Sequence, residues 1–153
     1  MRTCLILSLL VAFLTIPVAA QTDEIELTRS VIQTERQAII ARNLELTEAE
    51  GEEFWPAFRS YRGELAILGD RTVGMIRSYA ESFNADSMTD EKAEGLIREY
   101  FSIEESTLKL QKRWWKKFTK ILPARKAARY YQLENKLDAV IDVELADQIP
   151  LIP

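Results

Sequence analysis

The chain has 153 residues, of which 47% are hydrophobic, 24 are acidic and 20 are basic. It contains one cysteine and no histidine, so the commonest general base and most of the preferred ligands for zinc, copper and nickel are missing. The net charge of −4 excludes the overall basic character that nucleic-acid-binding proteins have.

Residues 1–20 have the features of a cleaved secretory signal. Arg2 supplies the positive start, residues 5–16 form an apolar run, and Val18-Ala19-Ala20 is a small-residue cleavage site. A membrane anchor is the alternative, but the apolar run is shorter than the roughly 20 residues that a spanning helix needs. We therefore expect an exported protein without a stable membrane anchor.

Removal of the signal would also remove Cys4 and leave no thiol in the mature chain. Disulfide and thiol chemistry are then excluded, and an exported domain without disulfides favours the bacterial periplasm over the extracellular space. Residues 21–149 are predicted to form a single helical domain. Pro150 and Pro153 cannot continue a helix, so residues 150–153 are predicted to form an apolar tail.

The first helix is expected from about Thr28 to Asn43. One of its faces carries apolar or small side chains and is the predicted buried face: Leu27, Val31, Thr34, Ala38 and Ala41, widened by Ile32, Ile39 and Ile40. The second helix is expected to begin at Thr47. The Thr47 hydroxyl can cap a free backbone N–H, and Glu50 three positions later completes a capping box.

A coiled-coil period follows this start signal. Apolar or nearly apolar residues recur in alternating steps of four and three: Phe54, Phe58, Tyr61, Leu65, Leu68, Thr72, Met75 and Tyr79. Pro56 should kink an early turn, and Gly63, Gly69 and Gly74 weaken the helix. A break within residues 69–74 is the alternative, but the uninterrupted seam favours a continuous, curved helix that ends near Tyr79.

A polar connection at Ser82–Met88 precedes a third helix that Thr89 is expected to cap. Its seam matches that of the second helix: Ala93, Leu96, Tyr100, Ile103, Thr107, Leu110 and Trp114, followed less regularly by Phe118 and Ile121. Pro123 suits the first position of a fourth helix, which continues through Tyr130, Leu133, Leu137, Val140 and Ile141. The predicted fold is all-α, a long antiparallel helical hairpin flanked by two shorter helices.

A basic, aromatic block covers the end of the third helix and the start of the fourth. No acidic residue occurs from 109 to 129, a stretch that contains Lys109, Lys112, Arg113, Trp114, Trp115, Lys116, Lys117, Lys120, Arg125, Lys126 and Arg129. The favoured interpretation is pairing with the acidic start of the second helix, which carries Glu45, Glu48, Glu50, Glu52 and Glu53. The alternatives are a partner-binding surface and, in an exported protein least of all, nucleic acid.

If the block binds a partner, the candidate residues are Trp55, Arg113, Trp115, Lys116, Lys117 and Lys120. Trp114 fits the seam and is expected in the core. Trp55 and Trp115 lie one position off the seams, where an aromatic ring beside cations suits a tolerant peptide-binding surface.

Nothing in the chain indicates catalysis. Adjacent carboxylates such as Glu104 and Glu105 do not face each other on a helix, and the glycines occur singly rather than in a phosphate-binding loop. We therefore expect no enzymatic activity, no cofactor and no metal.

The start of the second helix, Leu46-Thr47-Glu48-Ala49-Glu50, resembles the LTxxQ motif of the periplasmic Spy and CpxP family, with an acidic residue in the last position. The second copy of the motif would fall at Leu122-Pro123-Ala124-Arg125-Lys126, which lacks the threonine and the glutamine. The resemblance assigns Leu46, Thr47 and Glu50 the role of a structural cap. It implies a thin, curved homodimer that binds unfolded proteins without ATP or assists envelope-stress signalling.

A dimer is also expected on physical grounds, because two long helices and two short ones form a thin layer that would expose apolar surface in a monomer. The leading hypothesis is a periplasmic, chaperone-like or stress-adaptor protein that binds unfolded or envelope proteins. The alternative is a regulatory protein that docks on one envelope sensor.

Overall fold

The computed structural model describes residues 35–152. The predicted signal at 1–20, the first turns of the predicted first helix and Pro153 lie outside the described residues. Residues 35–44 are helical and are followed by α2 (Glu48–Asn84), α3 (Asp90–Ile121) and α4 (Ala124–Gln148). No residue from 35 to 152 is in a strand, which confirms the predicted all-α fold.

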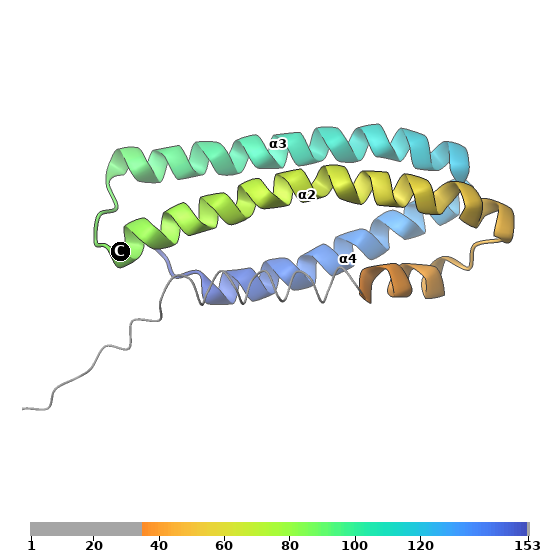
Figure 1. Ribbon diagram of the computed structural model, residues 1–153, viewed down its shortest axis with the longest axis horizontal. Helices are drawn as coiled ribbons and strands as arrows, with labels where there is room; N and C mark the ends of the chain where they lie inside the picture. Colours follow the sequence, from red (N-terminus) through yellow and green to blue (C-terminus); the bar gives the residue numbers. More distant parts are fainter. Residues whose placement is uncertain (1–34, 153) are drawn as a thin grey trace, which may run out of the picture.

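The helices α2 and α3 form the predicted antiparallel hairpin and lie side by side along their whole lengths (Figure 1). Crossing beneath them is α4, which contacts α3 near the end where α3 finishes (Figure 1). The helical segment 35–44 runs antiparallel to α4, because Arg36 contacts Asp138 while Asn43 accepts a hydrogen bond from Arg129.

The start of α2 has the predicted capping box. The Thr47 Oγ1 accepts a hydrogen bond from the Glu50 N–H at 3.3 Å, and the Glu50 carboxylate accepts one from the Thr47 N–H at 2.8 Å. Thr89 caps α3 by the first of these two bonds alone, since its Oγ1 accepts a hydrogen bond from the Lys92 N–H at 3.2 Å. These side chains satisfy backbone donors that the first turn of each helix leaves free.

The helix α2 continues through residues 69–74 without a break and ends at Asn84, five residues later than predicted. Phe83 follows Tyr79 by four positions and its ring stacks on that of Tyr79 at 5.8 Å, so the seam extends one more turn. The connection is correspondingly shorter, at residues 85–89. Asp86 there adopts a positive φ of 50°, a turn conformation that aspartate tolerates.

The hydrophobic core lies mainly at the end of the hairpin where α2 begins and α3 finishes. Its buried members come from all the described helices: Ile40, Leu44, Phe54, Phe58, Tyr61, Leu110, Trp114, Phe118, Leu122, Ala127 and Tyr130. Aromatic rings dominate the packing, and the ring centroids of Phe118 and Tyr130 are 4.7 Å apart. The predicted seams supply most of this core, whereas their positions beyond Tyr61 on α2 are only half-buried.

Several predicted positions are wrong. Tyr100 was expected in the seam of α3 but is 44% exposed, because α4 moves away from α3 toward its C-terminal end (Figure 1). Val140, one of the apolar positions of the fourth helix, is 61% exposed. Ala38 and Ala41 are also exposed, and the helix 35–44 instead buries Arg36, Ile40 and Leu44 at steps of four. Pro123 is the residue before α4 rather than its first residue.

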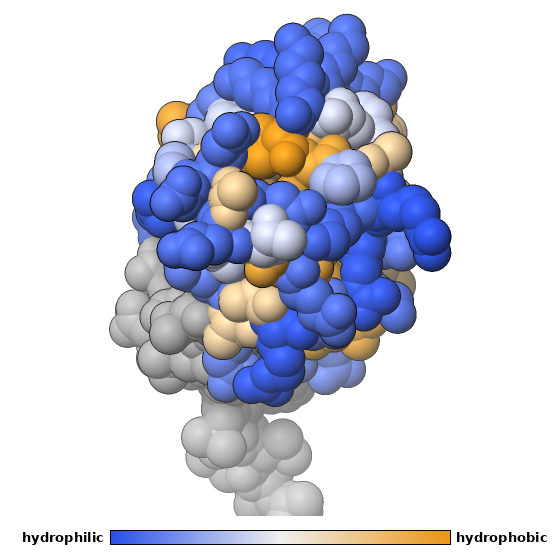
Figure 2. Space-filling view, turned by 90° about the vertical axis from the view of Figure 1, so that its right-hand side faces the viewer, coloured by the Kyte–Doolittle hydropathy of each residue, from blue (hydrophilic) through white to orange (hydrophobic). Residues whose placement is uncertain are grey.

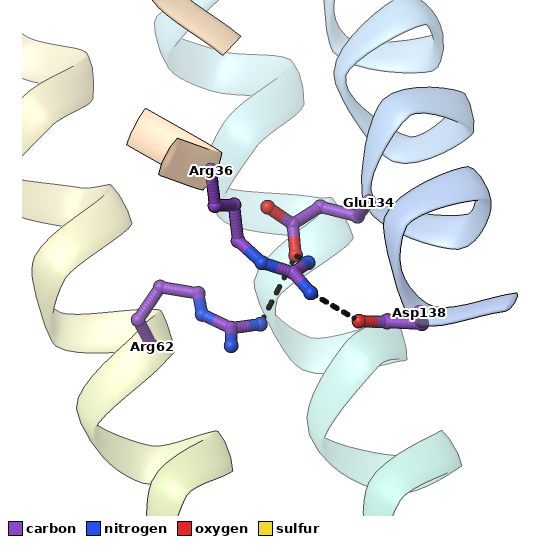
Figure 3. A network of polar contacts seen from close by, with 4 residues as sticks. All are labelled: Arg36, Arg62, Glu134 and Asp138. Carbon is purple, nitrogen blue, oxygen red and sulfur yellow. Dashed lines mark hydrogen bonds and ion pairs between the residues drawn. The ribbon is translucent and has the colours of Figure 1, made fainter. Parts of the chain in front are cut away.

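A buried ionic network fixes the crossing of the helices (Figure 3). The Arg36 guanidinium, 1% exposed, donates to Glu134 at 2.7 Å and to Asp138 at 2.8 Å, and Arg62 of α2 donates to the same Glu134 oxygen at 3.1 Å. Burial raises the pKa of Glu134, and the two guanidinium groups oppose that rise. The network therefore links the segment 35–44, α2 and α4 at one point.

Candidate partner-binding surface

The predicted basic block lies at the end of the bundle where α2 begins and α3 finishes. Figure 2 views this end, and hydrophilic side chains cover most of it around smaller hydrophobic areas. The expected pairing with the acidic start of α2 is limited to one ion pair, between Lys126 and Glu50 at 2.6 Å. Lys126 also donates to the backbone carbonyl of Glu45 at 2.9 Å. The hydrogen bond from Lys126, together with the Thr47 N–H, lowers the pKa of Glu50.

Three of the six candidate partner-binding residues are engaged within the molecule. Arg113 pairs with Glu64 of α2, and the Lys117 ammonium lies 3.8 Å from the centroid of the Trp114 ring. The ring of Trp55 packs against those of Phe54 and Phe58 at the edge of the core. These three side chains therefore already take part in contacts within the hairpin and its core.

The other three candidates lie on the outside of α3. The ring of Trp115 packs edge to face with that of Tyr131, with 6.2 Å between the ring centroids, and Trp115 remains 37% exposed. Lys116 follows the buried Trp114 by two positions and Lys120 follows Phe118 by two, which turns each about 200° away from the core. Neither lysine forms an ion pair with any residue from 35 to 152. The basic block is therefore divided between internal contacts and free cations.

Two shallow hollows, of about 410 Å³ and 470 Å³, lie one after the other along the junction of α2 and α3 on the outer side of the hairpin. We call the two hollows together the outer groove. Their apolar lining comes from Ile67, Leu68 and Leu110 in the first hollow and from Met75 and Leu96 in the second. Four of these five residues, all except Ile67, are seam positions, so the seam predicts the apolar lining, but it gives no signal that these side chains line hollows on the outer side.

Charged side chains of both signs border the groove and brace the two helices. Arg113 pairs with Glu64 beside the first hollow. At the second, Arg71 donates to Glu99 and to Ser102, each at 3.0 Å, and Lys92 donates to Ser78 at 2.6 Å. Each of these contacts spans the junction from one helix to the other, so a segment lying along the groove would pass over them and meet the apolar surface that lies between successive contacts.

Two glycines, Gly74 of α2 and Gly95 of α3, line the second hollow. A Cβ added at either would meet no atom within 4 Å, and no described glycine has a positive φ. Neither close packing nor a special backbone conformation accounts for them, although each glycine inside a helix costs up to about 1 kcal/mol relative to alanine. Their effect is to leave the backbone of the groove open.

A third hollow, of about 230 Å³, lies on the inner side between α2, α3 and the end of α4. Burial and the neighbouring Asp138 raise the pKa of Asp142 at its border. Arg36 binds Asp138, which lines this hollow. We therefore take the outer side of the hairpin as the candidate partner-binding surface.

Residues 35–152 contain no group of three or more histidine, cysteine, aspartate or glutamate side chains arranged to hold a metal ion. Within the same residues, no helix has both the length and the apolarity needed to span a bilayer. Comparison with protein-family models, with curated proteins and with solved structures finds no match to this chain.

Proposed function

We propose that this protein is exported to the periplasm and binds polypeptide segments without ATP, as a chaperone-like protein or envelope-stress adaptor. The bound segment lies in the outer groove between α2 and α3. The signal-like residues 1–20 support the location, and the resemblance of Leu46, Thr47 and Glu50 to the LTxxQ motif supports the class of function. No enzymatic step is part of this proposal.

The groove suits many sequences rather than one. An apolar lining attracts the hydrophobic side chains that unfolded chains expose, and it does so without directional contacts. The charged borders offer both signs, so they accept acidic and basic flanking residues. A shallow surface of this kind favours weak, reversible binding over the deep burial of a single anchor.

The open space at Gly74 and Gly95 carries the proposal. Replacement of both by glutamine adds two good helix formers that fill the second hollow without adding apolar surface. Gly63 of α2 is the matched control, because its Cβ would also meet nothing within 4 Å and it does not line either hollow. All of these changes are expected to preserve or raise stability, and only the Gly74→Gln/Gly95→Gln protein should lose binding.

The test is an aggregation assay with an unfolded client protein at increasing ratios of this protein, with circular dichroism as the check on folding. We expect wild type and Gly63→Gln to suppress aggregation equally and the double variant to need several times more protein. Equal suppression by all three would overturn the groove as the site. A folded wild type that suppresses nothing at any ratio would reject the chaperone function, and capture of one dominant envelope protein would favour a regulatory one.

A further inference from the structure

Four exposed lysines follow one another along the face of α3 that points away from the core. Lys109, Lys112, Lys116 and Lys120 are spaced by three, four and four residues, so their side chains leave the helix within an arc of about 80°. The buried Trp114 leaves it on the opposite side. We call the four lysines the lysine row. It is about 16 Å long at 1.5 Å per residue.

The lysine row has little negative charge beside it. Residues 106–129 contain nine basic and no acidic side chains, although the chain as a whole has a net charge of −4. Lys109 pairs with Glu105 of the preceding turn at 2.8 Å. The other three lysines form no ion pair with any residue from 35 to 152. The positive charge concentrated on this face therefore favours an anionic partner.

Two apolar side chains lie beside the lysine row. Leu108 is 49% exposed and Trp115 is 37% exposed, and they leave α3 about 40° and 60° to one side of Lys112. Tryptophan and leucine next to lysines are the composition of a helix face that lies in a membrane interface. Lysine is also a flexible point charge, which suits many loosely placed phosphates, whereas the arginine fork fits one anion in a fixed geometry.

We propose that the lysine row, with Leu108 and Trp115, docks on the surface of a bilayer that contains anionic phospholipids. The lipid phosphates supply the negative charge that the row lacks, and each lysine near such a surface strengthens binding about fivefold. Residues 90–105 contain six acidic and two basic side chains, so repulsion keeps that half of α3 away from the lipid. The bundle then touches the bilayer with the end where α3 finishes. Binding is reversible, because a few lysines and two apolar side chains are far weaker than a spanning helix.

Membrane docking and the outer groove can be tested separately. Lys109 lines the first hollow of the groove, whereas Lys112, Lys116 and Lys120 line neither hollow. Substitution of these three lysines therefore removes most of the row and leaves the groove intact. The triple variant should suppress client aggregation as well as wild type does, so neither proposal depends on the other.

The experiment measures co-sedimentation of residues 21–153 with two kinds of vesicle, phosphatidylcholine alone and phosphatidylcholine mixed with an equal amount of phosphatidylglycerol. Residues 1–20 are omitted because their apolar run would bind either vesicle, and circular dichroism checks that each protein is folded. We expect wild type to bind the mixed vesicles and not the neutral ones, with binding that weakens as the salt concentration rises. Lys112→Ala/Lys116→Ala/Lys120→Ala should weaken binding to the mixed vesicles on the order of a hundredfold.

The matched control is Arg59→Ala/Arg77→Ala/Lys136→Ala, which removes the same charge from exposed positions on α2 and α4 and should bind as wild type does. Equal weakening by the two triple variants would show that binding follows net charge alone, and the lysine row would then have no special role. Folded wild type that ignores the mixed vesicles at low salt, or binds the neutral ones equally well, would also overturn the proposal.

Soluble anions distinguish a bilayer from other partners. Glycerol phosphate should not displace the protein from the mixed vesicles, because a single phosphate engages one lysine at a time, and displacement would indicate a site for free phosphate instead. Polyglutamate and a short DNA duplex are compared with the vesicles at equal concentrations of negative charge. We expect both to bind wild type more weakly than the vesicles do. Tighter binding to either would assign the lysine row to that polyanion and overturn membrane docking.

Discussion

At the residue scale, Glu50 has two roles, which two separate patterns in the sequence suggest. Its carboxylate closes the capping box on the Thr47 N–H and also receives Lys126 from the start of α4. The cap was predictable because both of its residues are local, three positions apart. The contact with Lys126 depends on the return of α4 to the start of α2, which no local spacing encodes. Leu46 completes the predicted cap by packing against the core.

The pKa of Glu50 predicts a pH-dependent contribution to stability. Lys126 and the Thr47 N–H hold this pKa below its ordinary value of 4.5. Because the folded pKa is the lower one, the contribution is fully present above about pH 5 and is lost as the pH falls through the folded pKa. We expect wild type to be more stable than Glu50→Gln at pH 7 and the difference to shrink toward pH 3, as measured by urea unfolding. A difference that stays constant with pH would contradict this linkage.

At the scale of elements, the sequence predicts the helices well and their surroundings less well. The heptad seams of α2 and α3, together with the caps at Thr47 and Thr89, were sufficient for the hairpin. The prediction of burial failed where burial depends on a distant helix, as at Tyr100 of α3, because α4 moves away from α3 there. Arg36 was missed because a hydrophobic pattern gives no signal for a buried cation. The candidate cations of α3 are all lysine or arginine, but they differ in whether they have a partner within the molecule. Their position around the helix decides this difference.

Lys116 and Lys117 are adjacent and predict different effects. Lys117 lies over the Trp114 ring, a contact worth about 0.5–1 kcal/mol at an exposed site, whereas Lys116 has no such neighbour among the described residues. We expect Lys117→Ala to lower the free energy of unfolding by about that amount and Lys116→Ala to stay within about 0.5 kcal/mol of wild type, as surface substitutions usually do. Thermal unfolding of monomeric protein at low concentration measures both. Equal losses would show that the contact with Trp114 contributes nothing.

At the scale of the whole molecule, the orientation of α4 depends on the buried network more than on broad apolar contact. Beyond Tyr130 the buried side chain that α4 supplies is Glu134, and it bonds Arg36 and Arg62 from two other helices (Figure 3). Among residues 35–152 the network is incomplete, since Arg36 Nε and Glu134 Oε1 are buried and find no hydrogen-bond partner there. Such an arrangement defines one geometry for the helices while contributing little net stability.

The buried pair of Arg36 and Glu134 therefore predicts a strong non-additivity. Arg36→Met leaves the Glu134 carboxylate buried with Arg62 as its remaining cation, and Glu134→Leu leaves the Arg36 guanidinium buried with Asp138. Removal of one partner of a buried ion pair costs about 3–5 kcal/mol, whereas replacement of both by apolar residues is often nearly neutral. We expect the double variant Arg36→Met/Glu134→Leu to be more stable toward urea than either single variant.

The exposed pair of Arg98 and Glu94 is the matched control, since both side chains are about two-thirds exposed. Arg98→Met should change the free energy of unfolding by no more than about 0.5 kcal/mol, because an exposed pair contributes little. If the two buried-pair losses add in the double variant, Arg36 and Glu134 act independently and the network does not set the position of α4. If the double variant is the most stable of the three but loses its defined near-ultraviolet circular dichroism, the ion pair acts as the determinant of a single helix arrangement rather than as a source of stability.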